Sequence, residues 1–128
     1  MDKYDPNIAP EPVDWLELDE QERVSLVEAC HKAAKVKPPN LTLHAAVHVV
    51  VENQVAEEHP STVAAIARLM KEGLSRHDSV HAVGAVVAEH LFVALSNKDK
   101  NFADTAQARF DAAIGRLSAK GWLRDYGK

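Results

Sequence analysis

The chain has 128 residues, of which 46% are hydrophobic and 27% are charged, a balance typical of a soluble globular protein. A chain of this length can bury a core as one domain, so we expect residues 1–128 to form a single helical domain. The net charge of −4 argues against a nucleic-acid surface, which requires a basic face, and no uninterrupted apolar run approaches the roughly 20 residues of a membrane span.

Prolines dominate the start of the chain. Pro6, Pro10 and Pro12 exclude a regular helix or a central strand, so we expect residues 1–13 to form an extended arm. Further on, Asp19 and a glutamate three residues later match a capping box. This pattern predicts a first helix that runs from Asp19 to about residue 35 and stops before two consecutive prolines.

The second predicted helix begins after those prolines. Asn40 or Thr42 caps it, and it runs to about residue 58. Three consecutive valines at 49–51 would also tolerate a strand. The length of the segment, its capping and its apolar residues every three to four positions favour a helix, which Pro60 ends.

Two more helices follow, separated by a glycine. Ser61 caps the third helix, over residues 62–72, and Gly73 suits the position just after its end. Ser75 caps the fourth helix, and Asp78 is the acidic residue of another capping box.

A polar loop over residues 96–101 separates the fourth helix from a fifth, which is predicted from about residue 102 to residue 119. Gly121 closes the fifth helix and leaves a short tail over residues 122–126. The sequence therefore predicts an all-α, single-domain bundle of about five helices, with the second and fourth helices adjacent.

Histidine pairs recur on the apolar sides of two predicted helices. His44 and His48 lie one turn apart in the second helix, and His77 and His81 lie one turn apart in the fourth. Residues four positions apart point in similar directions, and Glu52 continues the first pair by another turn. An unpaired buried polar group costs on the order of 1–3 kcal/mol. A bound cation would satisfy several imidazoles at once, so we interpret the two pairs as one metal site.

The first helix adds another candidate pair. Glu28 and His31 have the Glu-x-x-His spacing of four-helix di-metal carboxylate proteins, although only this pair matches that class. Imidazole with carboxylate suits a divalent transition metal such as zinc, iron, manganese or nickel. Cys30 points away from His31, so we do not expect a thiolate ligand. The candidate metal ligands are His44, His48, Glu52, His77, His81, Glu28 and His31.

The stretch from His77 to His81 also resembles the zincin signature His-Glu-x-x-His, with Asp78 in place of the glutamate. In zincins that glutamate is the general base for a zinc-bound water. Asp78 is one methylene shorter, and it already serves as a capping residue. Zincins also place this helix against a sheet, and no strand is predicted here. We therefore do not expect protease chemistry, and no catalytic residue is assigned.

Two segments carry a resemblance to a known family: residues 43–54, LHAAVHVVVENQ, and residues 73–84, GLSRHDSVHAVG. With Tyr-Asp-Pro-Asn at residues 4–7, they resemble a domain-of-unknown-function family of small bacterial proteins. Members of that family carry a helical Gly-Leu-x-Arg-His-Glu-x-x-His-Ala-Ile-Gly segment, from which this chain departs at Asp78. The resemblance covers most of the chain. It implies a bacterial cytoplasmic protein, and it does not indicate any activity.

Two functions agree with the sequence. The first is a metal-binding helical bundle protein, with or without catalysis. The alternative is a non-catalytic interaction or structural module whose histidines form a buried hydrogen-bonded network. We expect neither a nucleic-acid nor a membrane partner, a homo-oligomer is compatible with the sequence, and no small-molecule substrate is indicated. One cysteine and no visible secretory signal favour the cytoplasm.

Overall fold

Helices account for all the regular secondary structure in residues 1–35, 38–97 and 102–126, which a computed structural model of the chain describes. The all-α prediction is therefore confirmed for this part of the chain. It holds seven α-helices and one 3-10 turn, so the expected number of about five is wrong. In chain order the elements are α1 (Pro12–Glu17), α2 (Glu20–Ala33), α3 (Leu41–Ala56), α4 (Pro60–Lys71), α5 (Arg76–Ser96), η1 (Ala103–Thr105), α6 (Ala106–Gly115) and α7 (Ala119–Tyr126).

Side-chain caps begin three of these helices where the sequence predicts them. The Asp19 carboxylate accepts from the backbone N–H of Glu22, whose side chain accepts from the N–H of Asp19 in return. Asn40 and Ser75 each accept from the backbone N–H three residues further on. Each bond satisfies a donor that the first turn of a helix leaves without an intrahelical partner.

Pro60 begins α4 instead of ending α3, which corrects the prediction that Ser61 caps this helix. The cap position belongs to His59, and Pro60 is the first helical residue. Proline suits that place because its φ angle is already helical and the helix does not need its missing N–H. α3 itself ends at Ala56.

The N-terminal arm is shorter than predicted. The expected arm covers residues 1–13, but α1 already starts at Pro12. Again a proline occupies the first turn, where its missing N–H costs nothing. Glu11 caps this short helix by accepting from the backbone N–H of Asp14. The helix then brings Trp15 into the core, where its side chain is fully buried.

The C-terminal part divides where one long helix was predicted. The expected helix over residues 102–119 is instead η1 followed by α6, which ends at Gly115. Gly121 lies inside α7 and does not end the predicted fifth helix. Its backbone N–H donates to the Ser118 hydroxyl. In the predicted loop 96–101, Ser96 is the last residue of α5, and positions 98–101 lie outside the described residues.

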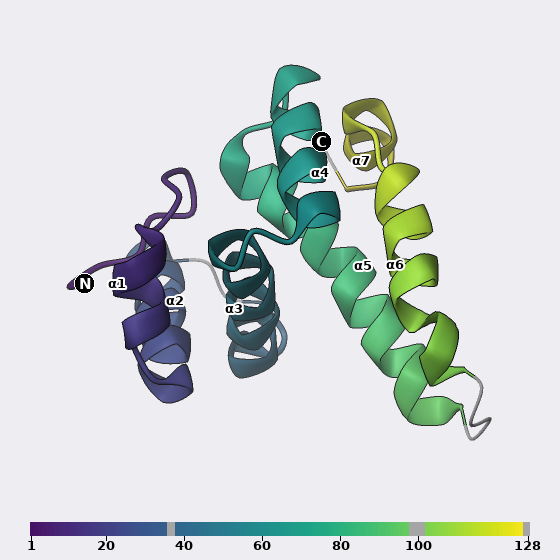
Figure 1. The fold of residues 1–128 in the computed structure, drawn as a ribbon. Coiled ribbons are helices and arrows are strands. Elements are labelled where there is room, and N and C mark those ends of the chain that lie inside the picture. The colour runs from purple at the N-terminus through teal and green to yellow at the C-terminus, as the bar shows by residue number, and fades with distance from the viewer. Residues whose placement is uncertain (36–37, 98–101, 127–128) are drawn as a thin grey trace.

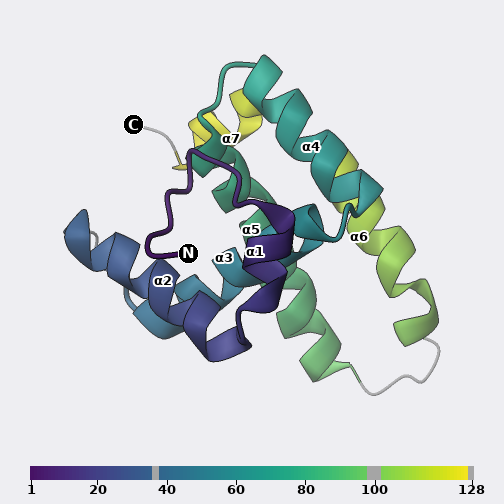
Figure 2. The same ribbon diagram turned by 60° about the vertical axis from the view of Figure 1, so that its left-hand side comes forward.

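α3 lies at the centre of the bundle. It packs against α1 and α2 on one side and against α5 on the other, while α4 and α6 pack on α5 (Figure 1). The prediction that the second and fourth predicted helices are adjacent is therefore confirmed for α3 and α5. Figure 2 shows how the N-terminal arm passes from α1 toward the start of α5, where the backbone N–H of His77 donates to the Asn7 side chain at 3.1 Å.

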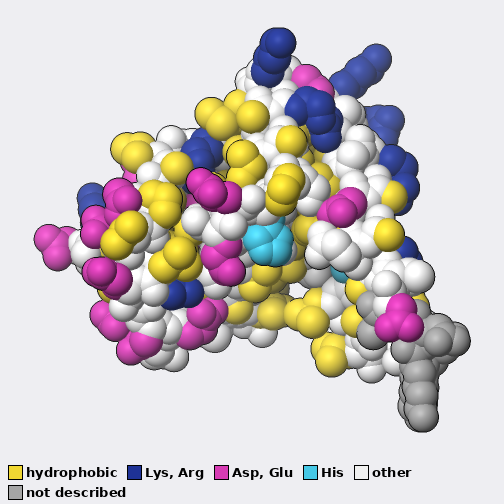
Figure 3. All heavy atoms as spheres, in the orientation of Figure 1, with side chains coloured by type: hydrophobic (Ala, Val, Ile, Leu, Met, Phe, Trp, Pro, Cys, Tyr) yellow, Lys and Arg dark blue, Asp and Glu magenta, His cyan; other side chains and the backbone are white. Residues whose placement is uncertain are grey.

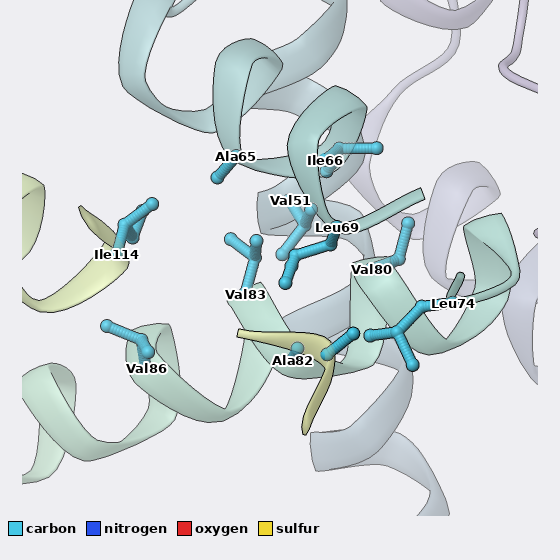
Figure 4. Packing of buried hydrophobic residues seen from close by; sticks show 11 residues of the cluster. Val51, Ala65, Ile66, Leu69, Leu74, Val80, Ala82, Val83, Val86 and Ile114 are labelled. Carbon is cyan, nitrogen blue, oxygen red and sulfur yellow. The ribbon is translucent and has the colours of Figure 1, made fainter. Parts of the chain in front are cut away.

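Two apolar clusters hold the helices together, and α3 contributes to both. Val51 of α3, Leu69 of α4 and Val83 of α5 are fully buried and point toward one another in the larger cluster (Figure 4). In the smaller cluster, α3 packs against the N-terminal arm, α1 and α2, and its buried members are Tyr4, Trp15, Val27, Ala45 and Val49. Both faces of α3 are thus fixed by apolar packing.

α5 is long and apolar enough to cross a membrane by length and composition alone. Its 21 residues have a mean hydropathy of 1.5 in their most apolar stretch, of which 33% is buried. A single helix of this kind is weak evidence, because the core helix of a soluble protein passes the same test. The expectation that the chain has no membrane partner stays a prediction.

Candidate metal centre

Five histidines from three helices meet where α3 lies between α2 and α5. His31 comes from α2, His44 and His48 come from α3, and His77 and His81 come from α5. The ring centroids of His48 and His81 are 4.7 Å apart, as are those of His31 and His44. The two pairs predicted from the sequence therefore face each other, and His31 joins them.

Four of these histidines form a compact group of potential ligand atoms: His31, His44, His48 and His81. One ring nitrogen from each lies within 4.8 Å of those of the other three. A tetrahedral ion with metal–nitrogen bonds of about 2.1 Å places its ligands about 3.4 Å apart, so modest side-chain movement would bring all four into range. His77 lies at the edge of this group, with its Nε2 3.1 Å from Nε2 of His81.

The backbone of α2 fixes which nitrogen of His31 is available. Its Nδ1 lies 2.8 Å from the carbonyl oxygen of Val27. Because a carbonyl oxygen only accepts, Nδ1 carries a proton, and the neutral ring therefore has its lone pair on Nε2. That Nε2 is buried and has no hydrogen-bond partner among the described residues. A protonated Nδ1 on a backbone carbonyl is the arrangement that orients histidine ligands in metal sites.

Tyr4 fixes the tautomer of His48 in the same sense. The Tyr4 hydroxyl donates to Oε2 of Glu52 at 2.5 Å and lies 3.3 Å from Nδ1 of His48. Burial, and then the charge of Glu52, raise the pKa of Tyr4, so the hydroxyl keeps its single proton. With that proton committed to Glu52, the oxygen can only accept from His48. Nδ1 of His48 therefore carries the proton, and its Nε2 presents a lone pair to the cluster.

Glu52, predicted as a metal ligand, accepts hydrogen bonds from Tyr4 and Arg76. Arg76 donates to both of its carboxylate oxygens at 2.8 Å, and the same guanidinium donates to the carbonyl oxygen of Pro6. The pair is almost sealed from solvent, with side-chain exposures of 7% for Arg76 and 0% for Glu52. Burial opposes the charge of Arg76, but its hydrogen bonds to Glu52 outweigh burial and raise its pKa. The carboxylate is thus neutralised by an arginine and lies behind His48.

His81 cannot satisfy both of its imidazole neighbours with one proton. Its Nε2 lies 2.8 Å from Nε2 of His48 and 3.1 Å from Nε2 of His77. Since Nε2 of His48 has no proton, His81 would have to donate to it, and it would then have no lone pair left for His77. Nε2 of His44 is also buried without a partner among the described residues. The cluster presents more lone pairs than its own protons can satisfy.

Burial favours the uncharged form of four of these histidines, His44, His48, His77 and His81, which is the form that coordination requires. Burial, followed by the neighbouring histidines, lowers the pKa of His48 to about 2 and that of His81 to about 3. Burial is also the main reason why the pKa values of His44 and His77 lie below their usual range. A metal would therefore not have to displace protons from these rings at neutral pH.

The remaining sequence candidate lies outside the group. Glu28 is half-buried at the surface of α2, and its carboxylate accepts from the Thr42 hydroxyl at 3.0 Å. Asp78, at the glutamate position of the zincin-like stretch, lies in the first turn of α5. His90 packs against Phe110 instead of joining the cluster. The structure thus brings together the histidine part of the predicted ligand set and places its two carboxylates elsewhere.

Tyr4 and Arg76 are part of this site and were not singled out as functional residues from the sequence. One signal for Arg76 exists. A cation in the first turn of a helix is unfavourable beside the positive end of the helix dipole, and Arg76 is the first residue of α5. Such a residue at the start of an apolar helix indicates a buried anion nearby. For Tyr4, the sequence offers only an aromatic residue in a proline-rich arm.

Charge is unevenly spread over the face of the molecule shown in Figure 3. Acidic side chains gather over the α1 and α2 end, lysines and arginines gather over the α4 and α7 end, and a histidine side chain is exposed between them. Solvent therefore reaches an imidazole directly on this face.

No family model, curated protein or solved structure matches the chain. The family resemblance described from residues 43–54 and 73–84 stays a prediction, and the function must be argued from the site itself.

Proposed function

We propose that the chain binds one divalent transition-metal ion through ring nitrogens of His31, His44, His48 and His81. The observation that carries this proposal is the direction of the lone pairs. Val27 and Tyr4 hold the protons of His31 and His48 on Nδ1, on the side away from the cluster. Nε2 of His31 then has no donor among the described residues, and Nε2 of His48 competes with His77 for the single proton of His81. A cation is an electron-pair acceptor that several imidazoles can share.

An all-imidazole ligand set narrows the choice of metal. Imidazole suits zinc, iron and nickel, whereas manganese prefers carboxylate and water oxygens. The predicted carboxylate ligands are engaged elsewhere, Glu52 by Arg76 and Glu28 by Thr42. We therefore favour zinc, iron or nickel, and propose no reaction for the site.

The alternative function, a buried histidine network without metal, requires every ring nitrogen to find a proton or a donor within the cluster. Nε2 of His31 and Nε2 of His44 are buried without such a partner among the described residues. Each costs on the order of 1–3 kcal/mol if it stays unpaired. This cost favours the metal over the network.

Metal content and affinity test the proposal. Protein purified without an affinity tag is analysed for bound metal, then stripped with chelator and titrated with Zn²⁺ by calorimetry. We expect one ion per chain. Losing a residue that only hydrogen-bonds to a metal ligand weakens metal binding about 10–100-fold. His44→Gln removes a proposed ligand itself, so it should weaken Zn²⁺ binding by more than that.

His59→Gln is the matched control, because His59 lies outside the cluster at the N-cap position of α4, where its side chain makes no capping hydrogen bond. This variant should bind the metal as the original chain does. Folding of each variant is checked by circular dichroism. A folded chain that binds no stoichiometric ion, or equal affinity in the His44→Gln and His59→Gln variants, would favour the hydrogen-bonded network.

A further inference from the structure

An apolar cavity of about 410 Å³ opens beside the histidine cluster. Three of the four proposed ligands, His44, His48 and His81, form part of its wall. The remainder of the wall comes from the segment before α3, from α3, from α5 and from α7, and includes Pro38, Leu43, Val47, Ala85, Ala88 and Trp122. Its volume falls within the range of small-molecule sites, about 300–1,000 Å³.

Among the residues that the structure describes, no aspartate, glutamate, lysine or arginine lines the cavity. Aliphatic side chains, prolines and one tryptophan surround a ligand there, and the imidazoles form the main polar surface. Such a wall suits a molecule with an apolar body, because burial of apolar surface is favourable and none of the described wall residues is an acid, a lysine or an arginine. Small side chains on α5, Ala85 and Ala88, leave space for a ligand near His81. Gly84 lets Val47 of α3 approach closely, because an added Cβ there would lie 3.0 Å from it.

The charge of the metal ion determines which chemical group the ligand presents to it. Four neutral imidazoles leave the two positive charges of a divalent ion uncompensated. Glu52, the buried carboxylate nearest to His48 in the hydrogen-bonded network, is already neutralised by Arg76. Asp5 and Asp78 act on His77, and neither belongs to the cavity wall. Next to an apolar wall, an unbalanced cation favours an anionic ligand.

We infer that the cavity binds a small monocarboxylate with an apolar chain, whose carboxylate ligates the metal and whose chain fills the space between α3, α5 and α7. This inference rests on the proposed metal site. The carboxylate occupies a fifth coordination position, an expansion that zinc accepts, and it supplies a negative charge that the described wall residues do not.

The test uses Co²⁺, whose visible absorption reports changes in its ligands, with octanoate and acetate as probes. Apoprotein is first loaded with Co²⁺, and each carboxylate is then titrated in. Octanoate should change the spectrum and bind at least about 100-fold more tightly than acetate, because each buried methylene adds several-fold in affinity. Octanol, which has the chain without the anion, should bind far more weakly than octanoate.

Variants that fill the cavity provide the structural arm of the test. Ala85→Phe places a ring in the cavity one turn from His81 and should weaken octanoate at least about 10-fold without weakening Co²⁺. Ala94→Phe is the matched control, since Ala94 is an exposed residue of the same helix outside the cavity. If Ala85→Phe does not fold, Ala88→Phe replaces it in the test, because Ala88 lines the cavity at its exposed rim.

The outcomes separate the two proposals. If Co²⁺ binds but octanoate binds no better than acetate, or binds the filled and control variants equally, the cavity inference is wrong and the metal site stands. If Co²⁺ itself does not bind, both proposals fall.

Discussion

The guanidinium of Arg76 donates to both carboxylate oxygens of Glu52 at 2.8 Å, and the pair is almost closed to solvent. Removing one partner from such a pair leaves a buried charge without compensation, which costs about 3–5 kcal/mol. We therefore expect Arg76→Met to lower the free energy of unfolding by that amount, measured by urea denaturation. Asp125→Asn breaks an ion pair whose side chains are 75% and 55% exposed, and it should change stability by less than about 1 kcal/mol.

A double variant distinguishes the ion pair from the packing of the arginine side chain. Arg76→Met combined with Glu52→Met removes both charges and keeps most of the volume. It should be more stable than Arg76→Met alone, because two apolar side chains replace a buried pair at little cost. Additive losses would mean that the two charges do not depend on each other.

The Tyr4 hydroxyl connects this ion pair to the metal site. Tyr4→Phe removes the acceptor that holds the proton of His48 on Nδ1, so both tautomers become available. We expect the affinity for Zn²⁺ to fall about 10–100-fold, the usual effect of losing an outer-shell partner, as measured by calorimetry.

Asn53→Ala is the control for Tyr4→Phe. It removes the acceptor of the Trp15 indole N–H in the same part of the core, and it should lower stability without changing metal affinity. Equal metal affinity in Tyr4→Phe and the original chain would show that the tyrosine has only a structural role.

Acid should destabilise the metal-free protein. In the folded chain the pKa values of His48 and His81 are lowered to about 2 and about 3, whereas in the unfolded chain both titrate near their usual value of about 6.5. Between these limits the unfolded chain binds more protons, so stability is complete above about pH 6.5 and is lost as the pH falls. His48, which is 2% exposed, alone adds a slope of up to about 1.4 kcal/mol per pH unit.

Urea midpoints of chelator-treated protein between pH 7.5 and 4.5 measure this slope. His48→Gln removes a group that takes up a proton in the unfolded chain but not in the folded one over this range. The stability of this variant should therefore depend less steeply on pH than that of the original chain. An unchanged slope in the folded variant would show that His48 does not carry the effect.

Local sequence patterns predict much of this site because helix periodicity is a local property. His44 and His48 share a direction on α3, as do His77 and His81 on α5, from their spacing alone. The caps at Asp19, Asn40 and Ser75 likewise depend on neighbours within three residues, so they follow from the sequence.

The chemistry around the histidines depends on contacts that no local pattern contains. Whether a buried carboxylate at position 52 meets a metal or an arginine depends on Arg76, 24 residues away, and on Tyr4, 48 residues away. Helical periodicity predicts only that Glu52 points in a direction similar to that of His48, four residues earlier. It cannot reveal that a proline-rich arm folds back with a tyrosine that accepts from His48.

The residues just after α3 and α4 predict opposite effects of glycine. Both helices end with a left-handed residue, Glu58 with φ +60° and Gly73 with φ +112°, and in both the next N–H closes on a carbonyl five residues earlier. L-residues with a side chain pay roughly 1–2 kcal/mol in this conformation, whereas glycine does not. Glu58→Gly should therefore raise the free energy of unfolding by up to about 1 kcal/mol.

Gly73→Ala should instead lower the free energy of unfolding by about 1–2 kcal/mol. An added Cβ at Gly73 meets no atom within 4 Å, so the loss would report backbone strain and not a clash. Gly115→Ala is the control, because it too has open space but no left-handed φ angle, and alanine at that end of α6 should be neutral or stabilising. Urea denaturation of the three variants measures the differences, and a stabilising Gly73→Ala would contradict the strain argument.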